Sequence, residues 1–325
     1  MNVVFMGTPE FARATLVPLC QSRHTVLAVV TGRDKKSSRG GALVPTPCRR
    51  EADNRGIPVL MPLSLKDSSF HTELKSFNAD LFVVVAFRVL PKEVFELPRQ
   101  GSINIHGSLL PKYRGAAPIH WAIINGDSQT GLTSFFLKET VDTGDMIAQV
   151  KVEIAADDTF DSLYQRLAEM SAPFLLKTLD LIESDSKPVA QPEGMASRAP
   201  KLTASDALID FGQPARHVRN FIRGLSTKPG SHTMFRGKKL KIHSSEIVEQ
   251  GASQKLEPGT LIVEKKRLLV QCGSNMLELK RLVPEAKKEM DGAQFINGLR
   301  PETGEILGGT PTVGMTLLKE SKENK

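Results

Sequence analysis

Runs of apolar, β-type residues alternate with stretches of helical periodicity through the first half of the chain. Four runs predict strands: Val3–Met6, Val26–Val30, Leu81–Ala86 and Ser102–His106. The third is apolar on both faces, as is typical of a central strand in a parallel sheet. After the first run, Thr8 is placed to cap a helix that starts at Pro9 and continues to about Gln21. Strands separated by helices predict an α/β fold whose doubly wound, Rossmann-like sheet is mostly parallel.

The same alternation continues beyond these strands. Ala116–Asn125 predicts a helix that Gly126 ends, and Thr159–Ser184 predicts a long amphipathic helix. Between them, Leu132–Leu137 and Met146–Ile154 predict two strands that flank a polar turn around Asp142. We assign all of these elements to one domain, residues 1–188.

The pattern changes after residue 188. The stretch Lys187–Ser205 contains three prolines and few apolar residues, so we place a linker at residues 189–206. Residues 207–325 form the second domain, where short β-type runs are divided by glycine and proline. Such spacing predicts a small β-barrel of the OB-like kind, with a sandwich as the alternative. The predicted elements are a helix over Ala215–Arg223, strands over Lys239–His243, Gly259–Val263, Arg267–Cys272 and Met276–Lys280, a helix over Gly292–Leu299, and a frayed tail over Lys319–Lys325.

The net charge of +7 is confined to the second part of the chain. Residues 1–188 contain 21 Lys and Arg against 21 Asp and Glu, whereas residues 189–325 contain 22 against 15. A basic domain of this kind fits a polyanionic partner such as nucleic acid, although a basic domain can also be merely soluble.

Several classes of protein and site have little support. Three cysteines far apart do not suggest a disulfide framework, and neither they nor the scattered histidines are spaced as metal ligands, so we expect no metal. No apolar run is long enough to span a membrane and no secretory signal begins the sequence, so we expect a cytoplasmic protein, and a monomer. The G-x-S-x-G, G-x-G-x-x-G and P-loop motifs are absent.

One strand end carries candidate chemistry. Asn104 and His106 are two residues apart, so their side chains share one face of the strand. The irregular segment Gly107–Gly115 follows at the carboxyl end, where open α/β sheets place ligands. An amide beside an imidazole can stabilise the oxyanion of a tetrahedral intermediate, and Asp142 can hold the imidazole. The alternative is an ordinary strand-end histidine and turn aspartate.

These residues form part of a longer pattern. Asn104-x-His106-x-Ser108-Leu109-Leu110-Pro111-x-Tyr113-Arg114-Gly115, followed by Val141-Asp142-Thr143-Gly144-Asp145, resembles the signature of formyltransferases that use 10-formyltetrahydrofolate. The opening Met6–Ala12 is also similar to that family, and the similarity covers nearly the whole chain. Within the family, the chain is most similar to enzymes that formylate methionyl-tRNA.

The resemblance implies specific roles for residues of this chain. It implies that Asn104, His106 and Asp142 are catalytic. It implies a folate site formed by Ser108, Leu109, Leu110 and Pro111, with a pterin pocket lined by Ala86, Phe87, Arg88, Leu90, Val141 and other residues of Glu139–Asp142. The segment Ala86–Pro91 is shorter than the family's usual A-Y-G-x-x-L-P, so the resemblance defines the pterin pocket less well than the catalytic residues.

The formyl acceptor must be inferred from features outside the signature. Relatives formylate glycinamide ribonucleotide, amino sugars or methionyl-tRNA, and all carry the same catalytic residues. Residues 33–50 hold six basic residues and one acidic residue, at the position of the loop that the tRNA enzymes insert in their first domain. The candidate phosphate contacts are Arg33, Lys35, Lys36, Arg39, Lys238, Lys239 and Lys241, and further candidates are Lys265, Lys266, Arg267, Arg216, Arg219 and Arg223.

The resulting hypothesis is formyl transfer from 10-formyltetrahydrofolate to the α-amino group of initiator methionyl-tRNA, for translation initiation. The alternatives are an amino-sugar formyltransferase with the same folate donor and an RNA-binding relative without catalysis. A binding module would have no need of Asn104, His106 and Asp142 together, which argues against the last alternative.

Overall fold

The computed structural model describes residues 1–36, 41–249 and 256–308, so the predicted tail Lys319–Lys325 lies outside the described residues. The chain divides into two compact units. Unit 1 comprises residues 1–119, 128–156 and 162–200, and unit 2 comprises residues 120–127, 157–161 and 201–325. Within the described ranges, no helix is both long and apolar enough to cross a membrane.

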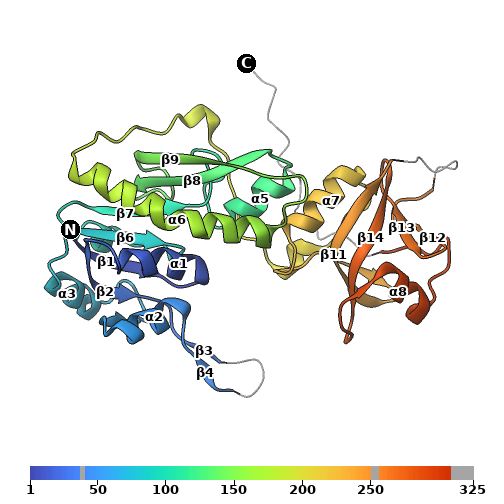
Figure 1. The fold of residues 1–325 in the computed structure, drawn as a ribbon, viewed down its shortest axis with the longest axis horizontal. Coiled ribbons are helices and arrows are strands. Elements are labelled where there is room, and N and C mark those ends of the chain that lie inside the picture. The colour runs from blue at the N-terminus through green and yellow to red at the C-terminus, as the bar shows by residue number, and fades with distance from the viewer. Residues whose placement is uncertain (37–40, 250–255, 309–325) are drawn as a thin grey trace. The chain divides into compact units, whose positions relative to one another are not determined.

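A seven-stranded sheet forms the centre of unit 1, in the order β5-β2-β1-β6-β7-β8-β9 (Figure 1). The first five strands of this order are parallel, β8 pairs antiparallel with β7, and β9 pairs antiparallel with β8. The mostly parallel, doubly wound sheet expected from the sequence is therefore confirmed. The strands are β1 (Asn2–Gly7), β2 (Thr25–Val30), β5 (Val59–Leu60), β6 (Leu81–Val85), β7 (Ser102–His106), β8 (Gln129–Phe136) and β9 (Met146–Glu153), and a separate hairpin is formed by β3 (Lys35–Lys36) and β4 (Leu43–Val44).

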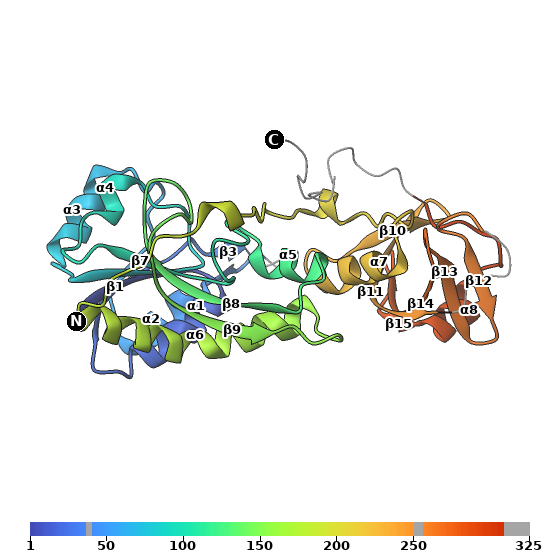
Figure 2. The same cartoon turned by 90° about the horizontal axis from the view of Figure 1, so that it is seen from above.

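Helices cover both faces of this sheet (Figure 2). Alternation along β1 explains how: Val4 and Met6 pack in one apolar cluster with Phe70 and Val94 of the covering helices α3 and α4. On the other face, the buried Thr15 hydroxyl of α1 lies 2.6 Å from that of Ser171 on α6. The helices of unit 1 are α1 (Glu10–Leu19), α2 (Pro47–Arg55), α3 (Ser68–Ser76), α4 (Lys92–Phe95) and most of α6 (Phe160–Glu183), whereas α5 (Pro118–Ile124) belongs to unit 2 from His120 onward.

The prediction for the start of α1 was wrong. The helix begins at Glu10, and its N-cap is Pro9, which has no side-chain capping bond. The Thr8 hydroxyl instead accepts a hydrogen bond from the Gly32 backbone N–H at 3.1 Å. Tertiary contact between the ends of β1 and β2 thus uses the hydroxyl that a local pattern assigns to the cap.

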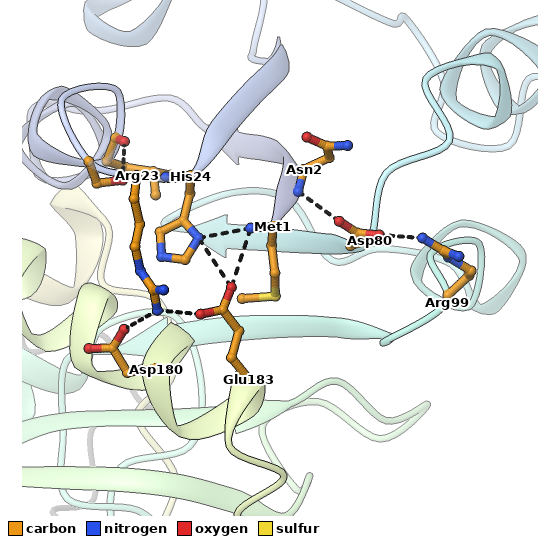
Figure 3. A network of polar contacts seen from close by, with 10 residues as sticks. Met1, Asn2, Arg23, His24, Asp80, Arg99, Asp180 and Glu183 are labelled. Carbon is orange, nitrogen blue, oxygen red and sulfur yellow. Dashed lines mark hydrogen bonds and ion pairs between the residues drawn. The ribbon is translucent and has the colours of Figure 1, made fainter.

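Charged side chains fasten the opposite, amino-terminal edge of the sheet (Figure 3). Arg23 binds Asp180 and Glu183, which both belong to α6. Near the starts of β1, β6 and β7, the Asn2 backbone N–H and the Arg99 guanidinium both donate to Asp80. These bonds lower the pKa of the Asp80 carboxyl, the Asn2 N–H contributing most. These contacts join elements of unit 1 to one another. They lie at the amino-terminal end of β1.

Unit 2 contains an antiparallel sheet in the order β10-β11-β14-β13-β12, with β15 paired to β14. Its apolar core includes Leu240, Leu268 and Leu282 from the sheet and Val218 and Phe295 from two helices. The expected β-rich, barrel-like second domain is confirmed. The elements are α7 (Ala215–Gly224), β10 (His232–Phe235), β11 (Lys238–Val248), β12 (Leu261–Glu264), β13 (Arg267–Gln271), β14 (Met276–Pro284), β15 (Met290–Asp291) and α8 (Gly292–Leu299).

The segment in which we placed the linker makes regular contacts with unit 1 over its first part. Val189 pairs with Met146 at the start of β9, and Arg198 pairs with Arg114. Residues up to Pro200 belong to unit 1, and short 3-10 turns occupy Glu193–Met195 and Ala204–Ala207. A segment with few apolar residues therefore still makes many contacts, because it forms hydrogen bonds to unit 1 through both its backbone and its polar side chains.

Candidate active site

Asn104 and His106 lie on β7, at the carboxyl edge of the parallel part of the sheet. The neighbouring positions Ile103 and Ile105 are buried at 0% and 3% exposure and pack in the core. Apolar packing on one face of β7 thus turns Asn104 and His106 to the other face together. His106 is 6% exposed, so the imidazole is buried at the end of its strand.

The His106 ring is held by two groups that follow it in the chain. Its Nε2 lies 2.8 Å from the Tyr113 carbonyl oxygen. A carbonyl oxygen only accepts hydrogen bonds, so Nε2 carries a hydrogen and Nδ1 is the nitrogen left to act. Nδ1 lies 3.8 Å from Asp142 Oδ2. Asp142 therefore lies at ion-pair distance from the imidazole, whereas the direct hydrogen bond of the ring is to the Tyr113 carbonyl.

Asp142 lies in the turn between β8 and β9 and is 8% exposed. Its Oδ2 accepts a hydrogen bond of 2.8 Å from the Gly115 backbone N–H. Its φ of +56° is in the left-handed region, which non-glycine residues rarely adopt. Gly144 follows, and a Cβ built there would lie 1.6 Å from the Phe136 carbonyl oxygen. The D-T-G sequence therefore has a physical reason: only glycine fits where the turn crosses β8.

The Asn104 amide lacks one partner. Its Oδ1 is buried and, among the residues that the structure describes, no group donates a hydrogen bond to it. A buried polar atom without a partner costs about 1–3 kcal/mol, so such atoms are rare unless a ligand supplies the partner. The amide is thus available to a ligand at the same strand face as His106.

Side chains of β8 and β9 hold the segment Ser108–Pro111. Thr133 Oγ1 donates to the Ser108 carbonyl at 2.7 Å and accepts from the Leu110 N–H at 3.1 Å. Gln149 Nε2 donates to the Leu110 carbonyl at 2.8 Å. The Ser108 hydroxyl, fully buried, donates to the Lys112 carbonyl at 2.6 Å. The irregular segment between β7 and α5 is therefore fixed in one conformation.

The segment Ala86–Leu90 lies beside this site. It follows β6, whose last residue, Val85, pairs with Ile105 of β7. Arg88 lies over the Phe87 ring at 5.2 Å, and its guanidinium donates to backbone carbonyl groups of the loop before α3. Leu90 is buried, whereas Val141 is 46% exposed. The structure thus brings Ala86, Phe87 and Arg88 to the same sheet edge as His106.

The basic residues predicted in the first domain lie on a β-hairpin. Lys35 and Lys36 form β3, pair with Val44 and Leu43 of β4, and are exposed. Arg33, which precedes the hairpin, is also exposed. The predicted contact Arg39 lies outside the described residues.

In unit 2, Lys239 and Lys241 share one face of β11 and pair with Met234 and His232 of β10. Burial, together with the positive charges of Lys239 and Lys241, lowers the pKa of His232. Lys238 is exposed on the same strand. This part of the sheet therefore has a positive local potential.

Some of the basic candidates in unit 2 already bond to other groups of that unit. Arg223 is partly buried and donates to the Asp158 carbonyl at 2.8 Å. Arg267 donates to Glu278 at 2.9 Å. Helical spacing and a run of charge suggested phosphate contacts for both, and in the structure both bond to groups of their own unit. Arg216, Lys265 and Lys266 are exposed.

Several groups at this site were not predicted from the sequence. The Tyr113 carbonyl that bonds to His106 is backbone, which no side-chain pattern reports. Thr133 and Gln149 belong to segments that were predicted to be strands but were given no role in the site. Gln191, whose amide donates to the Asp142 and Gly144 carbonyl oxygens at 2.9 and 2.8 Å, lies in the segment expected to be a linker. For Gln191, the only feature of the sequence that could have pointed to this role was a polar side chain in a segment without other patterns.

Comparison with known families and proteins agrees with the two units. Residues 1–179 match the family described as "Formyl transferase", and residues 201–300 match "Formyl transferase, C-terminal domain". A methionyl-tRNA formyltransferase from Pelotomaculum thermopropionicum is 40% identical over 95% of this chain and 99% of its own length. A methionyl-tRNA formyltransferase from Caldanaerobacter subterraneus is 41% identical over 94% of this chain and 100% of its own length.

The fold is also similar to that of solved structures. The sugar 3N-formyltransferase WlaRD, crystallised in the presence of dTDP and 5-N-formyl-THF, has a TM-score of 0.63 and 17% sequence identity. The similarity covers 89% of this chain and 99% of that one. At this level of identity, the likeness concerns the fold alone.

Proposed function

Because this chain belongs to the formyl transferase family, we propose that it transfers a formyl group from 10-formyltetrahydrofolate to the α-amino group of methionyl-tRNA. The observation that carries the proposal is the cluster of Asn104, His106 and Asp142. Three polar side chains from two separate segments lie at the carboxyl edge of the sheet, and among the described residues no group donates to the buried Asn104 Oδ1. Burying an acceptor oxygen without a partner is unfavourable, and a ligand N–H bound there would supply one.

In this proposal the chain's own groups manage charge and protons. The acceptor's α-amino group, whose pKa is about 8 in free form, attacks the formyl carbon while the bond from that carbon to the folate nitrogen breaks. The Asn104 Nδ2–H group and the Nδ1–H of a protonated His106 donate hydrogen bonds to the formyl oxygen and stabilise the negative charge that develops on it. Asp142 orients His106 and relays the amine proton toward the departing nitrogen. No covalent enzyme intermediate is needed.

The proposed donor site lies at the sheet edge between two segments. Ser108, Leu109, Leu110 and Pro111 lie on one side, and Ala86, Phe87, Arg88, Leu90 and Val141 supply further contacts. Support comes from the exposure of Val141 beside buried Asp142 and from the free Asn104 oxygen, since an apolar lining with few polar groups is typical of a small-molecule site. The donor, when bound, supplies the activated formyl group.

The proposed acceptor site uses the basic surfaces. The exposed Lys35 and Lys36 extend on a hairpin from unit 1, and Arg33 and Arg39 belong to the same basic loop. In unit 2, Lys238, Lys239 and Lys241 are the proposed phosphate contacts. Phosphate contacts place a polyanion without reading its sequence, so these residues favour tRNA over an uncharged small molecule. We therefore assign catalysis to residues 1–188 and tRNA binding mainly to residues 207–325.

A direct assay tests the function. The purified chain is mixed with 10-formyltetrahydrofolate and either methionyl-tRNA, uncharged tRNA with free methionine, or a nucleotide-linked amino sugar, and formylated product is measured by mass spectrometry. We expect product only with methionyl-tRNA. Efficient transfer to the amino sugar in its place would identify a sugar enzyme, and no transfer to any acceptor would contradict the proposal.

A further inference from the structure

Residues Gln191–Ala199, here called the strap, lie between the two matched family regions and outside both of them. The strap runs along the catalytic loop of unit 1 and bonds to its backbone. The Ser197 carbonyl accepts from the Arg114 N–H at 2.8 Å, and the Ala199 N–H donates to the Arg114 carbonyl at 2.7 Å. The Ser197 hydroxyl accepts from the Tyr113 N–H at 2.9 Å. The strap is therefore a built part of the site that binds the residue whose carbonyl holds His106.

Gln191 begins the strap and is 8% exposed. Its Nε2 donates one hydrogen to the Asp142 carbonyl at 2.9 Å and the other to the Gly144 carbonyl at 2.8 Å. Its Oε1 accepts two hydrogen bonds from Arg114, from Nε at 3.1 Å and from Nη2 at 2.8 Å. Both donors of the amide and both acceptor positions of its oxygen are used, so the side chain is fixed in one orientation.

These bonds close a ring around the catalytic carboxylate. Arg114 donates to Gln191, Gln191 donates to the Asp142 backbone, and the Asp142 carboxylate accepts from Gly115, the residue after Arg114. Asp142 has a φ of +56°, a backbone conformation that persists only where surrounding contacts hold it. Gln191 supplies two such contacts to this turn.

We infer that Gln191 is a positioning residue: it acts through the Asp142–Gly144 turn to hold the Asp142 carboxylate in place toward His106 and the reacting groups. The expected effect on catalysis rests on the proposed function. The hydrogen bonds by which Gln191 holds the turn do not depend on that function. Positional errors of about 1 Å can cost about 100-fold in rate, so loss of this support lowers turnover while leaving the substrate-binding surfaces in place.

Three variants separate this role from a general structural one. Gln191→Met keeps a side chain of similar volume and removes every hydrogen bond of the amide. Gln191→Glu keeps an oxygen toward Arg114 and removes the two donors to the turn. Glu193→Ala is the matched control in the strap: it removes only the ion pair between Arg114 and a carboxylate that is 72% exposed. Exposed pairs of this kind contribute little.

Two measurements are made on each full-length variant. In steady-state formylation of methionyl-tRNA, we expect kcat to fall about 10- to 100-fold for both Gln191 variants, with each substrate's KM within about threefold of the wild type. In hydrogen exchange read by mass spectrometry, we expect faster exchange in peptides containing Gly115, because its N–H bonds to Asp142. The Glu193→Ala variant should match the wild type in both measurements.

Each outcome decides the inference. Unchanged kcat in both Gln191 variants overturns it, as does a loss that appears equally in the KM values and in overall thermal stability. A fall in kcat for Gln191→Met but not for Gln191→Glu shows that the contact with Arg114 matters rather than the donors to the turn, and also overturns it. If the wild type does not formylate methionyl-tRNA, the proposed function fails, and hydrogen exchange at Gly115 alone then decides whether Gln191 holds the turn.

Discussion

The proposed catalytic cluster of unit 1 and the basic residues proposed to bind tRNA use polar side chains in opposite ways. His106 and Asp142 are 6% and 8% exposed and lie among fixed backbone groups, whereas Lys35, Lys36 and Lys238 are exposed on strands. A buried group acts at short range, so its effect depends strongly on its position. Removing it should therefore cause a large loss of activity. An exposed lysine acts through a screened field that tolerates movement, and its effect is shared with its neighbours. The two regions should therefore fail differently when they are altered.

The largest expected effect is that of His106→Ala. Removing the imidazole takes away an oxyanion donor and a proton-transfer partner, so kcat should fall about 1000-fold. The variant should remain folded and bind tRNA as the wild type does, because the basic residues are untouched. Steady-state kinetics, together with circular dichroism and a filter-binding assay, measure all three. Turnover near the wild-type value would contradict the catalytic assignment.

Gly144→Ala should disturb the same cluster by moving the backbone that carries Asp142. An added Cβ would lie 1.6 Å from the Phe136 carbonyl oxygen, so the turn that carries Asp142 must move. We expect the free energy of unfolding to fall by about 2–3 kcal/mol and kcat to fall at least about tenfold. Gly194→Ala is the control, because no atom of the described residues lies within 4 Å of a Cβ built there. Equal effects of the two changes on kcat would show that the turn's position is unimportant.

The paired change Lys35→Ala and Lys36→Ala tests the second region. Fewer phosphate contacts should raise the KM for methionyl-tRNA about 3- to 10-fold and reduce the slope of log affinity against log salt by about 1 to 2. kcat and the KM for the folate donor should change little. The pair Lys66→Ala and Lys75→Ala removes the same charge from exposed positions elsewhere in unit 1 and serves as control. An identical salt dependence for both pairs would show that the hairpin lysines contact no phosphate.

The smallest expected effect concerns His120, a half-buried group outside the proposed site. It tests whether burial alone changes the protein's behaviour at a position away from that site. In unit 2, His120 stacks on Phe160, its Nδ1 lies 2.7 Å from the Gly224 carbonyl oxygen, and burial lowers its pKa. As the pH falls below about 6.5, the unfolded chain takes up this proton before the folded one, so stability decreases on acidification.

His120→Asn keeps a donor at the position of Nδ1 and cannot be protonated. We therefore expect it to reduce the loss of stability between about pH 6.5 and 5, by less than about 1 kcal/mol. Urea unfolding at both pH values measures the difference, and unfolding at pH 8 provides the internal control for the changed packing. An unaltered decline would mean that His120 does not contribute to it.

Much of the architecture followed from periodicity. Leu81–Ala86 and Ser102–His106 were predicted as strands and are β6 and β7 within one residue, because an apolar run between turns has few other stable arrangements. The predicted helix Gly292–Leu299 has the observed bounds of α8, which Asp291 caps as the local pattern allows. The start of α1 was wrong because the competing partner of Thr8, the Gly32 N–H, is 24 residues away.

The site divides along the same line. The sequence by itself placed Asn104 and His106 on one strand face, since the period of two is a property of the extended backbone. Only the tertiary structure decided that Asp142 approaches His106, that the Tyr113 carbonyl fixes the ring, and that Gln191 bonds across to the turn. These contacts join residues up to 49 positions apart, and a hydrogen bond to a backbone carbonyl leaves no mark on the identity of the residue that accepts it. Side-chain periodicity therefore sets which face a residue occupies, whereas chain packing sets what it meets there.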